Sequence, residues 1–291
     1  MLWDKIKTSP QYVLPQHWLS ARAYSVTRWR WAPLKNFLIR VFVKIYRVDL
    51  QIAERKQAEL YDSFNDFFTR SLQASARPVN ADSQGLVSPV DGKVSQLGSI
   101  VNDQLLQAKS RYFSLNALLA DDEELITRFS GGLFSTIYLS PTDYHRIHFP
   151  VTAELKRMIY VPGDLFSVND STTRAVDKLF ARNERVICLF DTELGHMACI
   201  LVGAIFVGGM ETVWHGEITP ARSRECQNWE YGDDEKQGCQ YQKGEELGRF
   251  NMGSTVILLF EKDRVQWSQD FQVGSQVQMG QLIGTARPQK L

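Results

Sequence analysis

The sequence predicts an α+β fold, in which N-terminal amphipathic helices are followed by a largely antiparallel β body with barrel-sandwich-like phrases. Apolar residues at helical spacing are concentrated near the N-terminus. From about Gly85 onward, short β-rich runs are separated by glycine, proline and aspartate. With 44% hydrophobic and 23% charged residues, the 291-residue chain has the composition of a globular protein. We therefore expect a helical region over residues 1–62 and an α+β domain over residues 63–291.

The N-terminal segment is strongly basic, although the net charge of the whole chain is zero. Residues 1–48 carry nine lysine and arginine side chains and a single acid, Asp4. The same segment holds four of the seven tryptophans: Trp3, Trp18, Trp29 and Trp31. Tryptophan favours the headgroup layer of a bilayer, and basic side chains favour anionic lipid. The segment therefore predicts an anionic membrane surface as partner. Nucleic acid ranks well below it, since no motif of a nucleic-acid-binding module is present.

Residues 34–48 form a predicted helix with an apolar and a polar face. The apolar face has six members: Leu34, Phe37, Leu38, Val41, Ile45 and Val48. The polar face has four: Asn36, Arg40, Lys44 and Arg47. A helix in a membrane interface has this pattern, and so does a helix that packs on the protein's own core. We favour the membrane, because the apolar face is broad and almost no acid balances the charge.

The sequence predicts neither a transmembrane helix nor a signal peptide. Its longest apolar stretch, residues 37–43, is broken by Arg40 and is far shorter than the ~20 residues that span a bilayer. Residues 1–30 contain no uninterrupted apolar centre followed by a small-residue cleavage site. The four cysteines include no C-x-x-C pair, which indicates a reducing compartment. We expect a peripheral protein on the cytoplasmic face of the cell membrane.

Local patterns predict the further elements of the chain. Helices are expected over residues 49–60, 118–129 and 172–180. The clearest strands are expected over residues 186–190, 198–202, 204–207 and 255–260. The two later helices would lie among the strands of the β body.

Three short phrases of the β body resemble the turn-and-strand repeats of biotinyl and lipoyl carrier barrels. They are LVSPVDGKV (residues 86–94), QKGEELG (residues 242–248) and VQMGQLIG (residues 277–284). The resemblance offers a swinging-arm carrier as an alternative function, with the attachment lysine in an exposed hairpin. Lys93 is the nearest candidate, but it lacks the flanking methionine or the Asp-Lys-Ala context of those carriers.

Two of the five histidines, His145 and His148, stand three residues apart in the run DYHRIHFP. A His-x-x-His pair can bind zinc from one face of a helix, but Pro141 and Pro150 bracket this run and predict a loop. The further ligands that folding would have to bring together are Asp143, His196 and His215. A zinc-dependent hydrolase is therefore a second alternative function.

Three separated motifs identify a known family. They are SPVDG around Asp91, YHRIHFP around His145 and His148, and GST at residues 253–255. Supporting phrases are FFTR (residues 67–70), YVPGDLFSVN (residues 160–169), FARNERV (residues 180–186) and ETVW (residues 211–214). Together they resemble phosphatidylserine decarboxylase of the bacterial, membrane-associated type that makes its own pyruvoyl group. Met252 replaces the family's common leucine, a volume-conserving exchange that should cost little.

The resemblance implies that the chain cuts itself between Gly253 and Ser254, into residues 1–253 and 254–291. Ser254 Oγ would attack the carbonyl of Gly253, and His148 would take the proton as the base. Asp91 would hold the imidazole in the right tautomer and stabilise its cation. Gly253 has no Cβ, which lets the peptide adopt a strained, exposed geometry. Elimination from the resulting ester would leave dehydroalanine, which hydrolyses to a covalent pyruvoyl group at position 254.

The resemblance also implies the reaction. A decarboxylase needs an electron sink; the pyruvoyl ketone would form an imine with phosphatidylserine, which loses CO2 and is hydrolysed to release phosphatidylethanolamine. His145 is the candidate proton donor, and no metal is implied. The expected partners are the lipid substrate, the membrane and the two fragments for each other, with a homodimer left open. Residues 1–62 would associate with the membrane, and residues 63–291 would form the catalytic domain.

Overall fold

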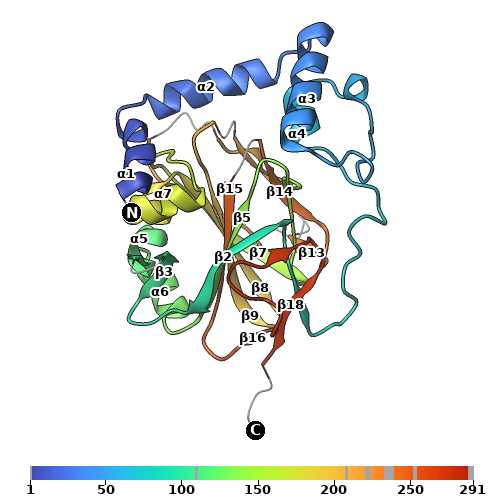
Figure 1. Cartoon of the computed structure of the whole chain (residues 1–291). Coiled ribbons are helices and arrows are strands. Elements are labelled where there is room, and N and C mark those ends of the chain that lie inside the picture. Colours follow the sequence, from blue (N-terminus) through green and yellow to red (C-terminus); the bar gives the residue numbers. More distant parts are fainter. Residues whose placement is uncertain are drawn as a thin grey trace.

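The structure is a computed structural model, and it describes residues 2–108, 111–206, 209–219, 224–232, 239–251 and 254–287. Within these ranges all pairs of named strands are antiparallel. Helices form the N-terminal part and flank one side of the β body (Figure 1). The predicted α+β fold with a largely antiparallel β body is confirmed.

A nine-stranded sheet forms the centre of the molecule. Its strands follow one another in the order β12 (Gln227–Glu230), β7 (Ala153–Val161), β8 (Arg185–Thr192), β9 (Gly195–Val202), β15 (Ser254–Phe260), β5 (Leu133–Leu139), β2 (Gly92–Ser99) and β17 (Gln276–Val277). The ninth strand, β13 (Gln240–Tyr241), also pairs with β7. The strands predicted over residues 186–190, 198–202 and 255–260 lie in β8, β9 and β15 and are confirmed.

Smaller sheets complete the β body. A four-stranded sheet has the order β11 (Gly216–Glu217), β10 (Met210–Thr212), β14 (Glu246–Phe250) and β6 (Arg146–His148). A three-stranded sheet has the order β1 (Gly85–Val87), β18 (Leu282–Ala286) and β16 (Val265–Trp267), and β3 (Gln104–Ala108) pairs with β4 (Arg111–Ser114). The first and third carrier-like phrases pair with each other through β1–β18 and β2–β17, whereas the second leads into β14. Residues of both the four-stranded and the three-stranded sheet share one hydrophobic core with the large sheet, so these sheets pack in a sandwich-like way.

Four short helices lie beside the large sheet: α5 (Leu115–Leu118), α6 (Glu123–Phe129), α7 (Asp170–Ala175) and α8 (Leu179–Arg182). They replace the two longer helices predicted over residues 118–129 and 172–180. The first is interrupted where Ala120 and Asp121 take positive φ, and the Asp122 carboxylate then caps α6 by accepting from the Leu125 N–H. Lys178, with φ of 55°, interrupts the second. Backbone turns, which apolar spacing does not reveal, set these boundaries.

Strand β15 is buried on both faces because its side chains alternate between two hydrophobic cores. Val256, Leu258 and Phe260 enter the core that the large sheet shares with the smaller sheets. Ile257 and Leu259 enter the core beneath α5, α6 and α8. The continuous apolar run of this strand is typical of a strand covered on both sides. Because β15 is packed on both faces, its N-terminus lies at the end of a rigid central element.

The N-terminal helices are α1 (Leu2–Thr8), α2 (Gln16–Thr27), α3 (Ala32–Tyr46) and α4 (Phe64–Phe68), with 3₁₀ turns at Ser9–Tyr12 and Ala58–Leu60. Figure 1 shows α2 crossing the end of the large sheet from which β15 starts. The Ser20 hydroxyl accepts from the Phe206 N–H at 3.1 Å, and the Tyr24 hydroxyl donates to Glu217 at 2.7 Å. These bonds fix α2 to the turn after β9 and to β11.

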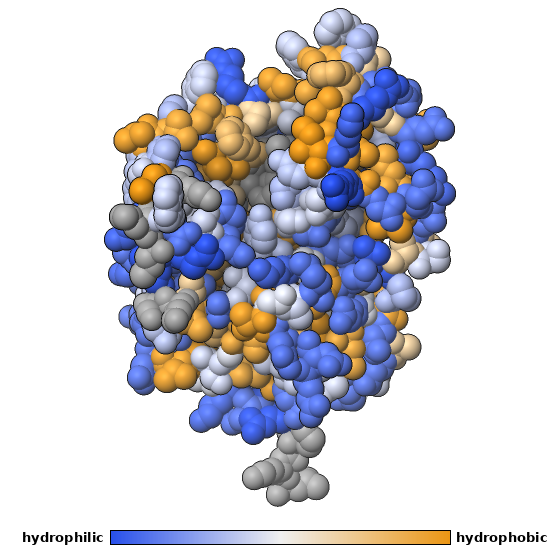
Figure 2. Space-filling model, in the orientation of Figure 1, coloured by the Kyte–Doolittle hydropathy of each residue, from blue (hydrophilic) through white to orange (hydrophobic). Residues whose placement is uncertain are grey.

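Helix α3 packs on the protein along one side and is exposed along the other. Its inner side packs on a small aromatic core, in which Ile39 is buried against Phe64, Phe67 and Phe68 of α4. Its outer side exposes Phe37 and Ile45, which are 61% and 68% accessible. The prediction of an amphipathic helix is confirmed, but the predicted apolar face divides between protein and solvent. Figure 2 shows hydrophobic side chains gathered over α2 and α3.

Two predicted elements are wrong. Residues 49–60 form turns rather than a helix, and only Ala58–Leu60 is helical, as a 3₁₀ turn. The backbone there bonds to a neighbouring segment, from Glu54 N–H to Ser71 O and from Gln73 N–H to Ile52 O. Residues 204–206 lie in a turn after β9 rather than in a strand, and residue 207 lies outside the described residues. In both places tertiary hydrogen bonding overrides the local pattern.

The described helices include none that is both long and apolar enough to cross a membrane.

Candidate active site

The site lies where β15 begins. Ser254 pairs with Leu139 at the end of β5, and Thr255 pairs with Val202 at the end of β9. The chain that leaves β5 runs through a turn directly into β6, which carries His148. Gly253 and the side chain of Ser254 lie outside the described residues. The preceding strand, β14, runs beside this segment, since the Phe250 N–H donates to His145 O at 3.0 Å.

Hydrogen bonds hold both the backbone and the ring of His148. Its backbone N–H donates to Pro89 O at 2.8 Å, and its Nδ1 lies 2.8 Å from Gly244 O. Because a carbonyl oxygen only accepts, Nδ1 carries the proton. Nε2 then holds a lone pair, which accepts from the Tyr144 hydroxyl at 3.0 Å. Burial lowers the pKa of His148, so the ring is a neutral base at Nε2 near pH 7.

Asp91 occupies the corner between β1 and β2, close to the segment that bonds His148. Its carboxylate accepts from the Arg77 guanidinium, with Nε 2.8 Å from Oδ1, and from the Met279 N–H at 2.8 Å. Among the bonds of the described residues, none joins Asp91 to His148. Gly244 O fixes the tautomer of His148, and the predicted role of Asp91 is reduced to stabilising the imidazolium by its charge.

His145 is completely buried, with 0% of its surface exposed. Its Nδ1–H donates to Asp143 O at 2.8 Å, and its ring packs on Phe68 with centroids 4.1 Å apart. Its Nε2 has no hydrogen-bond partner among the described residues. Burial, together with the positive charge of Arg70, lowers the pKa of His145 to about 3. The neutral ring therefore presents a free lone pair inside the protein.

The depressed pKa of His145 predicts a pH-dependent stability. Between the unfolded value of 6.5 and the folded value of about 3, the unfolded chain binds the extra proton. The free energy of unfolding should then fall by roughly 1.4 kcal/mol per pH unit as the pH drops below 6.5. Urea unfolding at pH 7 and pH 5 measures this loss. It should be smaller in His145→Gln, with both chains carrying Ser254→Ala so that processing cannot differ. Equal losses would contradict the buried, neutral assignment.

A pocket of about 350 Å³ opens beside these residues. Its polar wall includes Arg70, Arg77, Asp91, Asp143 and Tyr144. Its apolar wall includes Val48, Ile52 and Leu72, next to the C-terminal end of α3. Burial raises the pKa of the Asp143 carboxyl and raises that of Tyr144 to about 12, so the Tyr144 hydroxyl stays protonated near pH 7. The pocket thus combines charged and apolar walls in a volume that suits a small ligand.

The motifs assign no role in cleavage or decarboxylation to the other polar residues of this pocket. Arg70 appears in the sequence only as the end of the phrase FFTR, and Asp143 only as a candidate zinc ligand. Arg77 stands in a loop without any motif. The family phrase at residues 67–70 is the signal that could have directed attention to Arg70. Arg77 offers no comparable signal, because only the folded chain shows its contact with Asp91.

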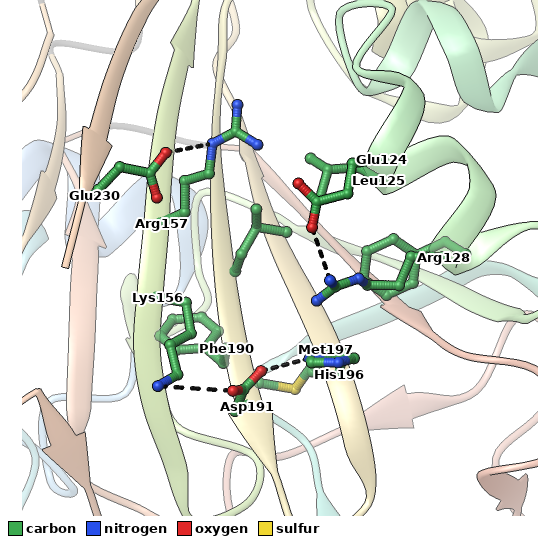
Figure 3. A pocket seen from close by; sticks show the side chains of 12 residues that line it. Glu124, Leu125, Arg128, Lys156, Arg157, Phe190, Asp191, His196, Met197 and Glu230 are labelled. Carbon is green, nitrogen blue, oxygen red and sulfur yellow. Dashed lines mark hydrogen bonds and ion pairs between the residues drawn. The ribbon is translucent and has the colours of Figure 1, made fainter. Parts of the chain in front are cut away.

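A second pocket, of about 290 Å³, lies on β7, β8 and β9 beside α6 (Figure 3). Met197 of β9 pairs with Phe260, at the opposite end of β15 from Ser254. The charged side chains in this pocket pair with one another, as Arg157 with Glu230, Arg128 with Glu124, and both Lys156 and His196 with Asp191. Because these charges neutralise one another, the pocket gives no evidence of a charged ligand. His196 precedes Met197 at this far end of the sheet, so it lies away from His145 and His148.

Neither alternative function gains support from the geometry. Within the described ranges, no group of three or more histidine, cysteine and acidic side chains is arranged to hold a metal ion. Lys93 lies inside β2 rather than at a hairpin tip, pairs there with Tyr138, and donates to Asp170 at 3.0 Å. An attachment lysine needs an exposed, free amine, and this amine is engaged.

Comparisons with known proteins agree with the motifs. The sequence profile of the family described as "Phosphatidylserine decarboxylase" matches residues 64–285, and a profile described as "PSD" matches residues 6–47. A "Phosphatidylserine decarboxylase proenzyme" of Pasteurella multocida is 50% identical over 97% of this chain and 95% of the relative. Proteins of the same name are 50% identical in Ectopseudomonas mendocina, over 95% and 96%, and 49% identical in Methylococcus capsulatus, over 97% of each chain. The chain belongs to the phosphatidylserine decarboxylase family.

Proposed function

We propose that this chain is a carboxy-lyase that converts phosphatidylserine into phosphatidylethanolamine and CO2, using a pyruvoyl group that it makes from Ser254. The observation that carries the proposal is the buried His145, whose Nε2 has no partner among the described residues. In the sequence, His145 directly follows Asp143 and Tyr144, which line the pocket. The match to the family's sequence profile is the second support. The name "proenzyme" of the relatives supports a precursor that is cut.

The first stage of the proposal is self-cleavage between Gly253 and Ser254. His148 supplies the base, because its Nε2 holds a lone pair and its Nδ1–H is committed to Gly244 O. The Tyr144 hydroxyl now bonded to Nε2 would yield its place to the Ser254 hydroxyl. Transfer of that proton leaves the serine oxygen free to attack the carbonyl carbon of Gly253. Asp91 remains the residue proposed to stabilise the imidazolium that forms, by its negative charge in the same site.

A pyruvoyl group at position 254 fits the residues around it. It supplies a ketone that takes up the electron pair left when CO2 departs. Nε2 of His145, which holds a lone pair in the free protein, would accept a proton from the ammonium group of the bound substrate and would then deliver it to this carbon. The lowered pKa of His145 means that a proton held at Nε2 is given up readily. Complete burial of the ring keeps bulk water from competing for that position.

Four measurements on the purified protein test this function. A denaturing gel should show two fragments that correspond to residues 1–253 and 254–291. Intact-mass analysis and amine trapping should find a ketone at the N-terminus of the shorter fragment. Incubation with phosphatidylserine should release CO2 and form phosphatidylethanolamine. An active preparation whose short fragment carries no reactive carbonyl would contradict the proposal.

The lipid substrate gives the N-terminal helices a role at the membrane. Phe37 and Ile45 of α3 project outward, and the exposed tryptophans are Trp3, Trp18, Trp29 and Trp31. Basic side chains accompany them, among them Arg40 and Lys44 of α3, which are exposed. We propose that this surface lies peripherally on an anionic, cytoplasmic membrane face. Residues 1–62 would then be the membrane-associating region and residues 63–291 the catalytic domain.

A double substitution tests the membrane role without disturbing the aromatic core. Phe37→Ser/Ile45→Ser removes two exposed apolar side chains, each worth about 1.5–3 kcal/mol when it is buried in lipid. The fraction that cosediments with phosphatidylglycerol-containing vesicles should fall at least about tenfold. Val101→Ser/Val273→Ser is the matched control, because both valines are exposed on the β body. Equal binding of the two variants would favour a purely structural role for α3.

A further inference from the structure

Arg70 is an unusual arginine in this protein. Only 2% of its surface is exposed, and its guanidinium lies over the ring of Phe67. One nitrogen, Nη2, donates to Thr142 O at 3.2 Å and reaches Asp143 O at 3.5 Å. Nε and Nη1 have no hydrogen-bond partner among the described residues. Two N–H-bearing nitrogens of a buried cation are thus left unsatisfied at the wall of the pocket.

Arg185 is a buried arginine of the same chain in which every guanidinium nitrogen has a hydrogen-bond partner. It is also 2% exposed. All three of its guanidinium nitrogens donate to carbonyl oxygens, including Leu118 O at 2.7 Å from Nε and Ala181 O at 2.8 Å from Nη1. A buried charge without such bonds costs several kcal/mol. The contrast indicates that a bound ligand supplies the hydrogen-bond acceptors that Arg70 lacks.

The charged groups near Arg70 do not neutralise it. Asp91 is held by Arg77 and by the Met279 N–H. The Asp143 carboxylate accepts from Ser140 N–H, and burial raises its pKa. Among the described residues, no carboxylate forms an ion pair with Arg70. Arg47 and Asp49 flank Val48 after α3 and add one charge of each sign to the wall, and the Asp49 carboxylate accepts from the Gln51 N–H at 2.8 Å. The unsatisfied donors of the pocket are therefore those of Arg70. The pocket therefore suits an anion that is attached to an apolar group.

Under the proposed function, the substrate offers two anions, its carboxylate and its phosphodiester. A cation on the carboxylate would stabilise charge that is lost as neutral CO2 leaves, and would therefore hold the ground state more tightly than the transition state. A cation on the phosphodiester would stabilise the ground state and the transition state equally, because that group is unchanged in the product. Arginine also matches phosphate with paired N–H donors. We propose that Arg70 is the substrate-binding residue that holds the headgroup phosphate.

Kinetics with short-chain lipid test this inference, which rests on the proposed function. With dihexanoyl phosphatidylserine as substrate, Arg70→Gln should raise KM about 10- to 100-fold, as expected for loss of hydrogen bonds to a charged group. kcat should change much less, because the contact is equal in substrate and transition state. Arg70→Lys, which keeps the charge but not the paired donors, should raise KM by a smaller factor. Arg185→Gln is the matched buried control, and it should lower thermal stability without changing KM.

Two competitive inhibitors separate the two anions. Glycerophosphoethanolamine carries the phosphodiester without the carboxylate, and O-methylserine carries the carboxylate without phosphate. In Arg70→Gln, inhibition by glycerophosphoethanolamine should weaken by the same factor as KM rises, and inhibition by O-methylserine should be unchanged. The reverse pattern would assign Arg70 to the carboxylate and overturn the proposal. Competition by inorganic phosphate but not by glycerophosphoethanolamine would indicate a free-phosphate site and overturn it as well.

A binding measurement keeps the proposal testable if the Arg70 variants do not mature. Uncut Ser254→Ala protein should bind glycerophosphoethanolamine in calorimetric titrations, and Ser254→Ala/Arg70→Lys should bind it at least about tenfold more weakly. Thermal denaturation checks that both chains are folded. Equal binding would overturn the assignment of Arg70. By contrast, a wild-type protein that neither cuts itself nor releases CO2 would contradict the proposed function itself.

Discussion

Ser254→Ala protein is expected to remain one uncut chain of 291 residues and to have no detectable decarboxylase activity. The substitution removes the hydroxyl that would attack the carbonyl of Gly253, so that no ester can form and no ketone can be generated. Without the ketone there is no electron sink, and no other side chain of the protein can replace it. Denaturing gels and CO2 release from phosphatidylserine measure the two effects on the same preparation.

A nearby serine provides the matched control. Ser135 lies on β5, pairs with Leu258 of β15, and its buried hydroxyl has no partner among the described residues. Ser135→Ala removes a hydroxyl from the neighbouring strand and should leave cleavage and activity at wild-type levels. Ser254→Cys keeps a nucleophile and should restore cleavage in part. Normal cutting of Ser254→Ala would show that another residue is the nucleophile.

The second large effect is expected at His148. His148→Ala removes the base, and the first-order rate constant of self-cleavage should fall about 10²- to 10⁴-fold. His196→Ala is the control, since that histidine lies in the other pocket and pairs with Asp191 (Figure 3). The rate constant is measured on gels after synthesis of the precursor in a cell-free system. Cleavage at the wild-type rate in His148→Ala would remove this residue from the mechanism.

The environment of His148 adds two finer expectations. Its pKa is lowered by burial, so the neutral base persists below pH 6.5. The rate constant of cleavage should accordingly be flat from pH 8 to about 6.5 and should fall only at lower pH. Tyr144→Phe removes the hydroxyl that now occupies Nε2, and cleavage should proceed at least as fast as in wild type. A strong loss of cleavage in Tyr144→Phe would instead give this hydroxyl a direct role.

The parts of the fold that the sequence predicts well are those with long, regular patterns. The run of apolar residues in β15 marks a strand buried on both faces, and the spacing in α3 marks an amphipathic helix. Residues 49–60 have a helical pattern but fold as turns, since their backbone pairs with residues 71–73. A contact between distant segments leaves no trace in local spacing, which is why this prediction fails.

In the candidate site, the sequence predicts which residues take part but not the contacts that they make. Motifs name Asp91, His145, His148 and Ser254, because the chemistry of cleavage and decarboxylation needs those residue types. They do not reveal that Gly244 O bonds His148 or that Arg77 holds Asp91. Nor do they reveal that Arg70 is buried with unpaired nitrogens. These facts depend on a carbonyl, a loop arginine and the depth of a side chain, which are set only when the chain is folded.

The central position of β15 determines how firmly the two fragments would stay together after cleavage. The shorter piece would begin with β15, which lies between β9 and β5, and it also carries β17 and β18, which pair with β2 and β1. The two pieces would therefore be interleaved and could separate only by dismantling the large sheet. Once separated, they would have to find each other by diffusion, so recovery from denaturation should depend on protein concentration. The uncut precursor, by contrast, should refold as a single molecule, with a recovery that does not depend on protein concentration.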